Sequence, residues 1–289
     1  MPESISSSIL KPKLLCRLTL CAALAAASAY AQDTGTVHEA PYVPSPRVTV
    51  DEMLRLAAVG PQDVVYDLGA GDGRVVIAAA AKFGARGVGV ELDPELVAMA
   101  KRAAARAGVA ERVRFLQQDL FATDLAPATV IALYLSPGMN LKLRPALLAL
   151  APGTRIVSHA SGMGEWQPDR RTSIRKDVML WIVPARAAGQ WTSEFTLGAR
   201  TQRLSIALSQ RYQEVRAEAR LDGAEAQVWD AALEADRLAF VIVERPGEEG
   251  EAGLYFEGRV SDAAIEGTVA RGVGSVRRSA PWRAERRAR

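Results

Sequence analysis

The chain has 289 residues, 49% of them hydrophobic, which is enough for two modest domains. Its formal net charge of +3 comes largely from the two ends, and no basic stripe interleaved with aromatic residues follows a helix, so nucleic-acid binding has no support. The chain has two histidines and no cysteine beyond residue 21, which cannot make the usual zinc sites, so we expect no metal.

Residues 1–31 have the pattern of a secretory signal peptide. Basic residues precede an apolar core at Leu18–Ala27, and Ala29-Tyr30-Ala31 forms an A-x-A cleavage site. The apolar core is too short for a comfortable membrane span, so membrane association gains no support from it. We expect an exported or periplasmic protein, or a cytoplasmic one if this segment is not functional.

A first domain is predicted over residues 47–184, after an extended lead-in at residues 32–46. Thr49 and Glu52 match a capping box, which predicts a helix that starts there, runs to Ala58 and covers one edge of a cofactor pocket.

A glycine-rich turn follows. An apolar strand at Asp63–Asp67 leads into Gly69, Gly71 and Gly73, and an amphipathic helix is predicted directly afterwards at Val75–Phe83. Open α/β sheets build nucleotide pockets from this order of strand, glycine turn and helix, because glycines adopt positive φ and let a ligand approach the backbone.

The next two strands each deliver an acidic residue. The strand Arg86–Glu91 ends in a carboxylate placed to accept hydrogen bonds from two ribose hydroxyls. Asp93 is predicted to cap the following helix. The strand Val113–Gln117 is followed by Asp119, which can accept from an exocyclic amine, and by Leu120, which can contact a purine. A fourth strand is predicted at Thr129–Leu135 and is apolar, as for a strand buried on both faces.

These motifs together resemble the class I S-adenosylmethionine-dependent methyltransferases. Asp72 lies at the helix start, where its charge would repel a dinucleotide pyrophosphate and suits an amino group, so a dehydrogenase is the less favoured alternative. The resemblance implies a doubly wound Rossmann-like α/β sheet and S-adenosyl-L-methionine as cofactor. The residues implied for cofactor binding are Asp67, Gly69, Gly71, Asp72, Gly73, Glu91, Asp119 and Leu120.

Further residues resemble one subfamily. The segment Pro41–Pro46, Tyr134-Leu135 and Ser158-His159 are similar to the lysine methyltransferases that act on the c-type subunit of ATP synthase and on adenine nucleotide translocase, and to their bacterial relatives. The exit of the fourth strand lacks the Pro-Pro-aromatic sequence of DNA amino-methyltransferases. The resemblance implies a protein lysine as methyl acceptor. A small-molecule methyltransferase and an exported, non-catalytic binding protein on this fold remain alternatives.

Four polar or aromatic residues near this region have open roles. Tyr134 could hydrogen-bond an incoming amine as a catalytic residue, or simply pack on the next helix. His159 could be a base or a structural hydrogen-bonding group, Trp166 a lid or a loop anchor, and Asn140 is expected to cap a helix. A strand is predicted at Thr154–His159.

Short alternating segments predict a second domain at residues 188–283, followed by a basic tail at 284–289. Strands are predicted from Arg203 to Ala270 with turns such as Asp222-Gly223 between them, which is typical of an antiparallel barrel or sandwich. Substrate docking, dimerisation and simple stabilisation are all open as roles for this domain.

Overall fold

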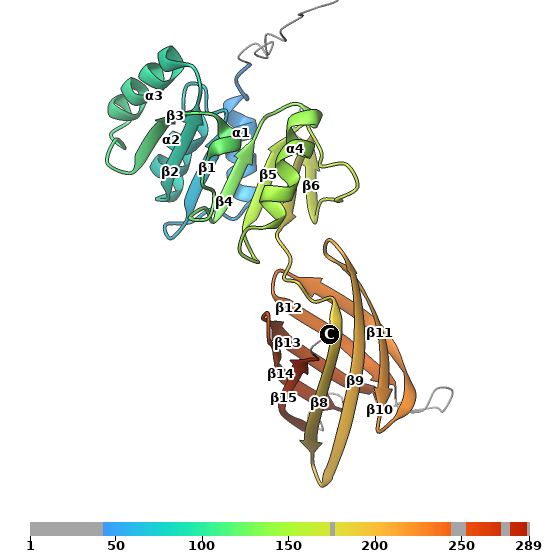
Figure 1. The fold of residues 1–289 in the computed structure, drawn as a ribbon. Coiled ribbons are helices and arrows are strands. Elements are labelled where there is room, and N and C mark those ends of the chain that lie inside the picture. Colours follow the sequence, from blue (N-terminus) through green and yellow to red (C-terminus); the bar gives the residue numbers. More distant parts are fainter. Residues whose placement is uncertain (1–42, 174–176, 244–252, 273–277, 288–289) are drawn as a thin grey trace, which may run out of the picture. The chain divides into compact units, whose positions relative to one another are not determined.

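The computed structural model describes residues 43–173, 177–243, 253–272 and 278–287 (Figure 1). The predicted signal peptide and most of the predicted lead-in lie outside the described residues. None of the helices in these ranges is both long and apolar enough to cross a membrane.

The first part of the described chain is a seven-stranded sheet with helices on its faces (Figure 1). The strand order is β3-β2-β1-β4-β5-β7-β6, in which β1 to β5 are parallel and β7 runs antiparallel to both β5 and β6. The elements are α1 (Arg47–Leu56), β1 (Val64–Leu68), α2 (Arg74–Phe83), β2 (Arg86–Glu91), α3 (Pro94–Arg106), β3 (Val113–Gln117), η1 (Leu120–Ala122), β4 (Val130–Leu133), α4 (Pro137–Leu148), β5 (Arg155–His159), β6 (Arg170–Ser173) and β7 (Asp177–Ile182).

This topology confirms the predicted Rossmann-like class and fixes where a ligand can bind. Chain order reverses at β1, which lies between β2 and β4. In open α/β sheets the crevice outside the carboxyl ends of the strands at such a switch point is the ligand site. The carboxyl ends of β1 to β5 all meet at one edge because these strands are parallel.

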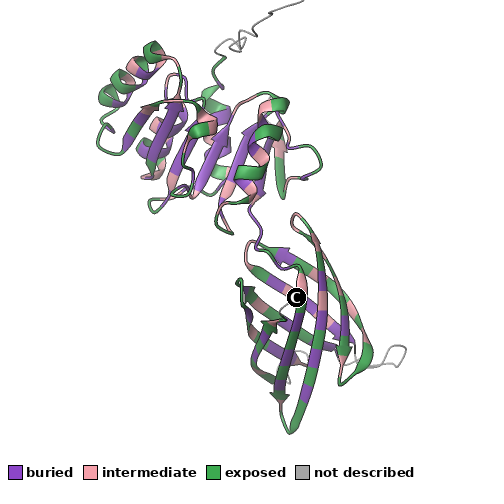
Figure 2. Cartoon of the chain, in the orientation of Figure 1, coloured by how far each residue is buried: buried purple, intermediate pink, exposed green. Residues whose placement is uncertain are grey.

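The sheet is buried on both faces, as Figure 2 shows for its central strands. All four residues of β4 are buried. Along β1, Val65 packs in one core cluster while Tyr66 and Leu68 pack in the other, because successive side chains of a strand point to opposite faces. The strands predicted at Arg86–Glu91 and Val113–Gln117 are confirmed with the same bounds.

One predicted helix cap is confirmed and one is wrong. The Asp93 side chain accepts a hydrogen bond from the Glu95 N–H at 2.7 Å, as expected of an N-cap. In contrast, α1 begins before Thr49, at Arg47, with Pro46 as N-cap and no side-chain cap. Thr49 lies within the helix and is buried with Val50 and Met53, so burial of this helix face, and not capping chemistry, sets the start of α1.

The second part is a closed eight-stranded antiparallel barrel, so the barrel alternative of the prediction is correct and the sandwich is not. The strands, in the order β10-β11-β12-β13-β14-β15-β8-β9, are β8 (Gly189–Leu197), β9 (Arg200–Arg211), β10 (Glu214–Leu221), β11 (Ala224–Glu234), β12 (Arg237–Val243), β13 (Gly253–Val260), β14 (Ala264–Arg271) and β15 (Arg278–Arg286).

Aromatic side chains fill the barrel interior. The rings of Phe240 and Phe256 stack at 4.8 Å between centroids, and Trp282 contacts Phe256 edge-on at 5.1 Å. Gly267 lets the strands approach beside these rings, since a Cβ there would lie 1.9 Å from the Glu257 carbonyl oxygen. The alternation of buried and exposed residues along the barrel strands is visible in Figure 2. This interior is a hydrophobic core, and pairing of β8 with both β9 and β15 closes the barrel around it.

Candidate active site

The glycine turn crosses the carboxyl ends of β1 and β2. Gly69, Gly71 and Gly73 have φ values of +80°, +54° and +78°, which L side chains rarely adopt. The N–H groups of Gly69 and Ala70 both bind the Val90 carbonyl at 2.9 Å. A Cβ on Gly73 would lie 2.6 Å from the Phe115 ring, so this position requires glycine for space as well as for backbone conformation.

Glu91, at the end of β2, accepts hydrogen bonds that hold this turn in place. Its Oε2 accepts a hydrogen bond from the Gly71 N–H at 2.8 Å. Its Oε1 accepts from the N–H groups of Leu92 and Asp93 at 2.8 and 3.1 Å. The carboxylate predicted to bind a ribose therefore also holds the glycine turn in place. The sequence pattern did not indicate this second role.

Asp67, the last polar residue of β1, is buried and faces other carboxylates. Burial raises its pKa well above the ordinary range, and the charges of Glu91 and Asp72 add to that effect, while Arg74 opposes it. A cation placed among these groups would relieve their repulsion. S-adenosylmethionine carries positive charge on its sulfonium and amino groups, so the donor set at this edge fits that cofactor.

Asp72 is paired with Arg74. The Arg74 Nε and Nη2 atoms bind the two Asp72 oxygens at 2.9 and 2.7 Å, and Nη1 binds the Ser45 carbonyl at 2.8 Å. The sequence alone predicts that the charge of Asp72 repels phosphate and suits an amino group. The structure weakens that prediction, because a guanidinium two residues away neutralises much of the charge.

Asp119 and Leu120 follow β3, which pairs with β2, and so lie beside the acidic residues at the ends of β1 and β2. The Asp119 Oδ1 accepts from the Phe121 N–H at 2.9 Å and so caps the short helix η1. Leu120 is half-buried. The Gln118 N–H binds the Glu91 carbonyl at 3.1 Å, which joins the ends of β2 and β3. The structure thus brings Asp67, Glu91 and Asp119 to one edge, on three neighbouring strands.

The ends of β4 and β5 carry a different set of side chains. The rings of Tyr134 and His159 stack with centroids 4.2 Å apart and an interplanar angle of 27°. His159 is 2% exposed, and its Nδ1 lies 2.8 Å from the Oγ of Ser45. The sequence singled out both rings but did not indicate their contact or the part played by Ser45.

Two open roles near this aromatic pair are resolved. Asn140 is fully buried in α4 and binds the Ser161 carbonyl through its Nδ2 at 3.1 Å, so the prediction that it caps a helix is wrong; Ser136 is the N-cap. Trp166 is fully buried and its carbonyl accepts from the Trp181 Nε1 at 2.8 Å, which is the contact of a loop anchor.

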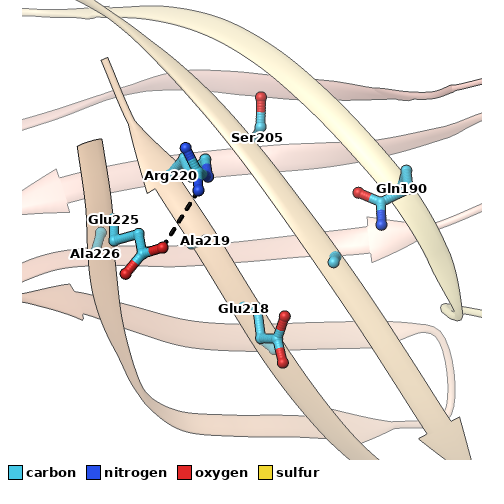
Figure 3. A pocket seen from close by; sticks show the side chains of 9 residues that line it. Gln190, Ser205, Glu218, Ala219, Arg220, Glu225 and Ala226 are labelled. Carbon is cyan, nitrogen blue, oxygen red and sulfur yellow. Dashed lines mark hydrogen bonds and ion pairs between the residues drawn. The ribbon is translucent and has the colours of Figure 1, made fainter. Parts of the chain in front are cut away.

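Neither a metal site nor the hollow on the barrel is a stronger candidate than this edge. Among the residues that the structure describes, no cluster of histidine, cysteine and acidic side chains could hold a metal ion. A hollow of 420 Å³ lies on the barrel wall, where Arg220 binds Glu225 at 3.2 Å (Figure 3). None of the predicted site residues lines this hollow. The sheet edge, where the glycine turn and acidic residues meet, is the better candidate on chemical grounds.

Comparison with known proteins shows methyltransferases among the relatives of this chain. The family described as ANTKMT methyltransferase domain matches residues 67–170. The protein-lysine N-methyltransferase of Saccharolobus islandicus is 40% identical over 134 residues, which are 46% of this chain and 83% of that protein. The adenine nucleotide translocase lysine N-methyltransferase of Mus musculus is 36% identical over 132 residues, 45% of this chain and 57% of that protein. The chain thus spans little more than half the length of the mouse relative.

Among solved structures, an RNA methyltransferase from Salinibacter ruber in complex with S-adenosyl-L-homocysteine is 53% identical, with a TM-score of 0.49. The match covers 50% of this chain and 95% of that one. The residues that the family matches, 67–170, include the glycine turn, Glu91 and Asp119. The chain therefore belongs to the ANTKMT methyltransferase family, and its sheet domain is an S-adenosylmethionine-dependent methyltransferase.

Proposed function

We propose that this methyltransferase methylates the ε-amine of protein lysines. The observation that carries the proposal is that the sheet edge has an acidic, glycine-rich part and a separate aromatic part. Carboxylates and glycines lie at the ends of β1 to β3, and the stacked rings of Tyr134 and His159 lie at the ends of β4 and β5. The Saccharolobus and mouse relatives are named as lysine methyltransferases, which supports the same acceptor.

The residues that would hold the cofactor are the glycine turn with Asp67 and Glu91 around its charged end, and Asp119 with Leu120 beside its base. When bound, S-adenosylmethionine supplies a methyl group on a sulfonium, which is a good leaving group. The neutral lysine nitrogen would form its bond to the methyl carbon as the carbon–sulfur bond breaks, with the electron pair of that bond remaining on sulfur and one proton of the amine passing to solvent. Positioning of the nitrogen in line with that bond supplies most of the catalysis.

The aromatic half of the edge would act on the acceptor. A lysine amine has an ordinary pKa of about 10.4, and only its neutral form attacks. Contact of the lysine methylenes with the half-buried Tyr134 ring would remove water from around the amine, and loss of water disfavours the charged form. Tyr134 directly follows β4, and its hydroxyl would hydrogen-bond the incoming nitrogen.

Radiolabelled methyl transfer into a cell extract tests the acceptor. Purified full-length protein, cofactor labelled in the methyl group and the extract are incubated, and the labelled material is treated with protease or ribonuclease. We expect protease-sensitive label recovered as methyl-lysine, and none with Glu91→Ala. Ribonuclease-sensitive label would refute lysine and favour RNA as the acceptor. Label in small molecules would favour the small-molecule alternative.

We also propose that residues 1–31 direct export, on the strength of their signal-peptide pattern. S-adenosylmethionine is made in the cytosol, so export would separate the enzyme from its supply. A fusion of the full chain to a reporter active in only one compartment tests this directly. Cytosolic retention would refute export. Export, combined with no methyl transfer to any extract, would favour a non-catalytic binding protein.

A further inference from the structure

We infer that His159 and Ser45 are positioning residues that hold the Tyr134 ring as the wall along which the methyl acceptor approaches. The inference rests on the proposed function, since it concerns the acceptor side of the same site. Three groups of contacts carry it: one from the segment before α1, one from the loop after β5 and one from the aromatic pair itself.

The first group ties the segment before α1 to both halves of the sheet edge. Ser45 is 5% exposed although its neighbours Pro44 and Pro46 are exposed. Its Oγ lies 2.8 Å from the His159 Nδ1, and its carbonyl accepts from Arg74 at 2.8 Å. Because Arg74 also binds Asp72, a line of hydrogen bonds runs from the glycine turn through Ser45 to His159.

The second group fixes the backbone on the other side of His159. Ala160 has a φ of +68°, which is unfavourable for a residue with a Cβ. Its N–H binds the Asp177 carbonyl at 2.7 Å, and the Ser161 N–H binds the His159 carbonyl at 2.9 Å. The buried amide of Asn140 holds the Ser161 carbonyl. Strained backbone persists where surrounding contacts determine it, and such places cluster at functional sites.

The third group is the aromatic pair. His159 is almost fully buried, whereas Tyr134 is half-buried and lies directly before Leu135 and the N-cap of α4. The stacking therefore places a buried, hydrogen-bonded ring behind the partly exposed ring of Tyr134. An aromatic wall of this kind suits the long methylene chain of a lysine, which can lie along it with the amine at the far end.

A double-mutant cycle on the full-length protein tests the inference. Ser45→Ala removes the hydroxyl, and His159→Phe keeps a ring for stacking but removes the nitrogen that Ser45 contacts. Ser193→Ala is the matched control, because it removes a buried hydroxyl that binds the Arg283 carbonyl at 2.6 Å in the barrel. The measurements are the cofactor Kd by calorimetry, the KM and kcat with the protease-sensitive fraction of the extract as acceptor, and amide exchange of Thr49 and Val50, whose N–H groups bind the Pro46 carbonyl.

We expect Ser45→Ala and His159→Phe each to raise the acceptor KM roughly fivefold or more, as for a lost hydrogen bond, with the cofactor Kd within about twofold of wild type. The double variant should resemble either single variant, because both remove the same contact. Amide exchange of Thr49 and Val50, which anchor Pro46 to α1, should be faster in all three, and Ser193→Ala should change none of these values.

Two results would overturn the inference while leaving the proposed function intact. One is an unchanged acceptor KM in both single variants of an enzyme that still forms methyl-lysine. The other is an increase in KM that adds across the two substitutions, which would mean that Ser45 and His159 act separately. Absence of methyl-lysine with the wild-type protein would instead refute the proposed function, and the inference with it.

Discussion

The two halves of the sheet edge are built from different chemistry. The ends of β1 to β3 bring together carboxylates and a glycine turn, with Asp67 buried among acidic neighbours. The ends of β4 and β5 bring together aromatic rings, held by a neutral hydroxyl. A cationic cofactor requires the first arrangement, whereas an amine that must lose a proton before it attacks is favoured by the second. Under the proposed function, the first half of the edge would bind the cationic cofactor and the second half would favour the neutral form of the acceptor amine.

The largest effect should come from the glycine turn. Gly73→Ala should abolish detectable cofactor binding and lower the free energy of unfolding by about 2–4 kcal/mol, since it combines left-handed strain with a clash against Phe115. Gly108→Ala is the matched control, because Gly108 has a φ of +70° but no atom within 4 Å of its Cβ position. Calorimetry and urea unfolding measure both variants. Equal losses of unfolding free energy in the two variants would show that the clash with Phe115 contributes nothing.

Asp67→Asn should separate function from stability in the cofactor half. We expect cofactor affinity to fall roughly tenfold to a hundredfold, as for loss of a charge-assisted interaction of about 1.5–3 kcal/mol. The apo protein should become more stable at neutral pH. Because the folded-state pKa of Asp67 is raised, wild-type stability falls as the pH rises from the unfolded pKa of about 3.9 towards the folded one.

The measurement for Asp67→Asn is the apo melting temperature as a function of pH. The variant should match wild type below the unfolded pKa, and the two curves should diverge as the pH rises. A variant that is less stable than wild type at neutral pH would contradict the interpretation of Asp67 as a destabilised carboxyl held for a cation.

Asp63 lies directly before β1, at the other end of the strand from Asp67. Its effect on stability should have the opposite dependence on pH. Burial alone would raise the pKa of Asp63, but hydrogen bonds from Thr129, the Gly60 N–H and Arg155 outweigh it and lower the pKa. Such a group stabilises the fold above its unfolded pKa, and that stability is lost as the pH falls through the folded pKa. Asp63→Asn should cost about 1–3 kcal/mol at pH 7, with cofactor affinity unchanged.

Urea unfolding of Asp63→Asn at pH 7 and again near pH 3 checks the sign. The difference from wild type should shrink at the lower pH, where the wild-type carboxyl also becomes protonated. If the difference grew on acidification, the assignment of a lowered pKa would be wrong. Together with Asp67→Asn, this variant compares aspartates at the two ends of β1: Asp63, which lies directly before the strand, and Asp67, which lies within it.

The cofactor half could be predicted because its signals are local in sequence. Glu91 ends β2, the glycine turn follows β1 directly and Asp119 lies two residues after β3, so strand, turn and candidate ligand group can be found by pattern alone. The ion pair between Arg74 and Asp72 was harder to predict. Arg74 and Asp72 are two residues apart, but nothing in the sequence shows that the guanidinium folds back onto the carboxylate.

The acceptor half could not be predicted in the same way, because tertiary contacts assemble it. Ser45 and His159 are separated by 114 positions, and only the folded sheet brings them together. Burial likewise overrode local chemistry at Thr49, whose capping-box pattern lies inside α1. In the barrel, Pro281 argues against a strand by its missing N–H, yet it pairs with Thr268 within β15.

The smallest effect should come from Tyr134→Phe, which keeps the stacked wall but removes its hydroxyl. If that hydroxyl binds the acceptor nitrogen, kcat/KM should fall roughly fivefold, as for one hydrogen bond of about 1 kcal/mol, while cofactor affinity stays at the wild-type value. Tyr255→Phe, on the exposed side of β13, is the control. A Tyr134→Phe enzyme with unchanged kcat/KM would leave the ring as the only contribution of Tyr134. The acceptor half would then work by shape alone, in contrast to the charged cofactor half.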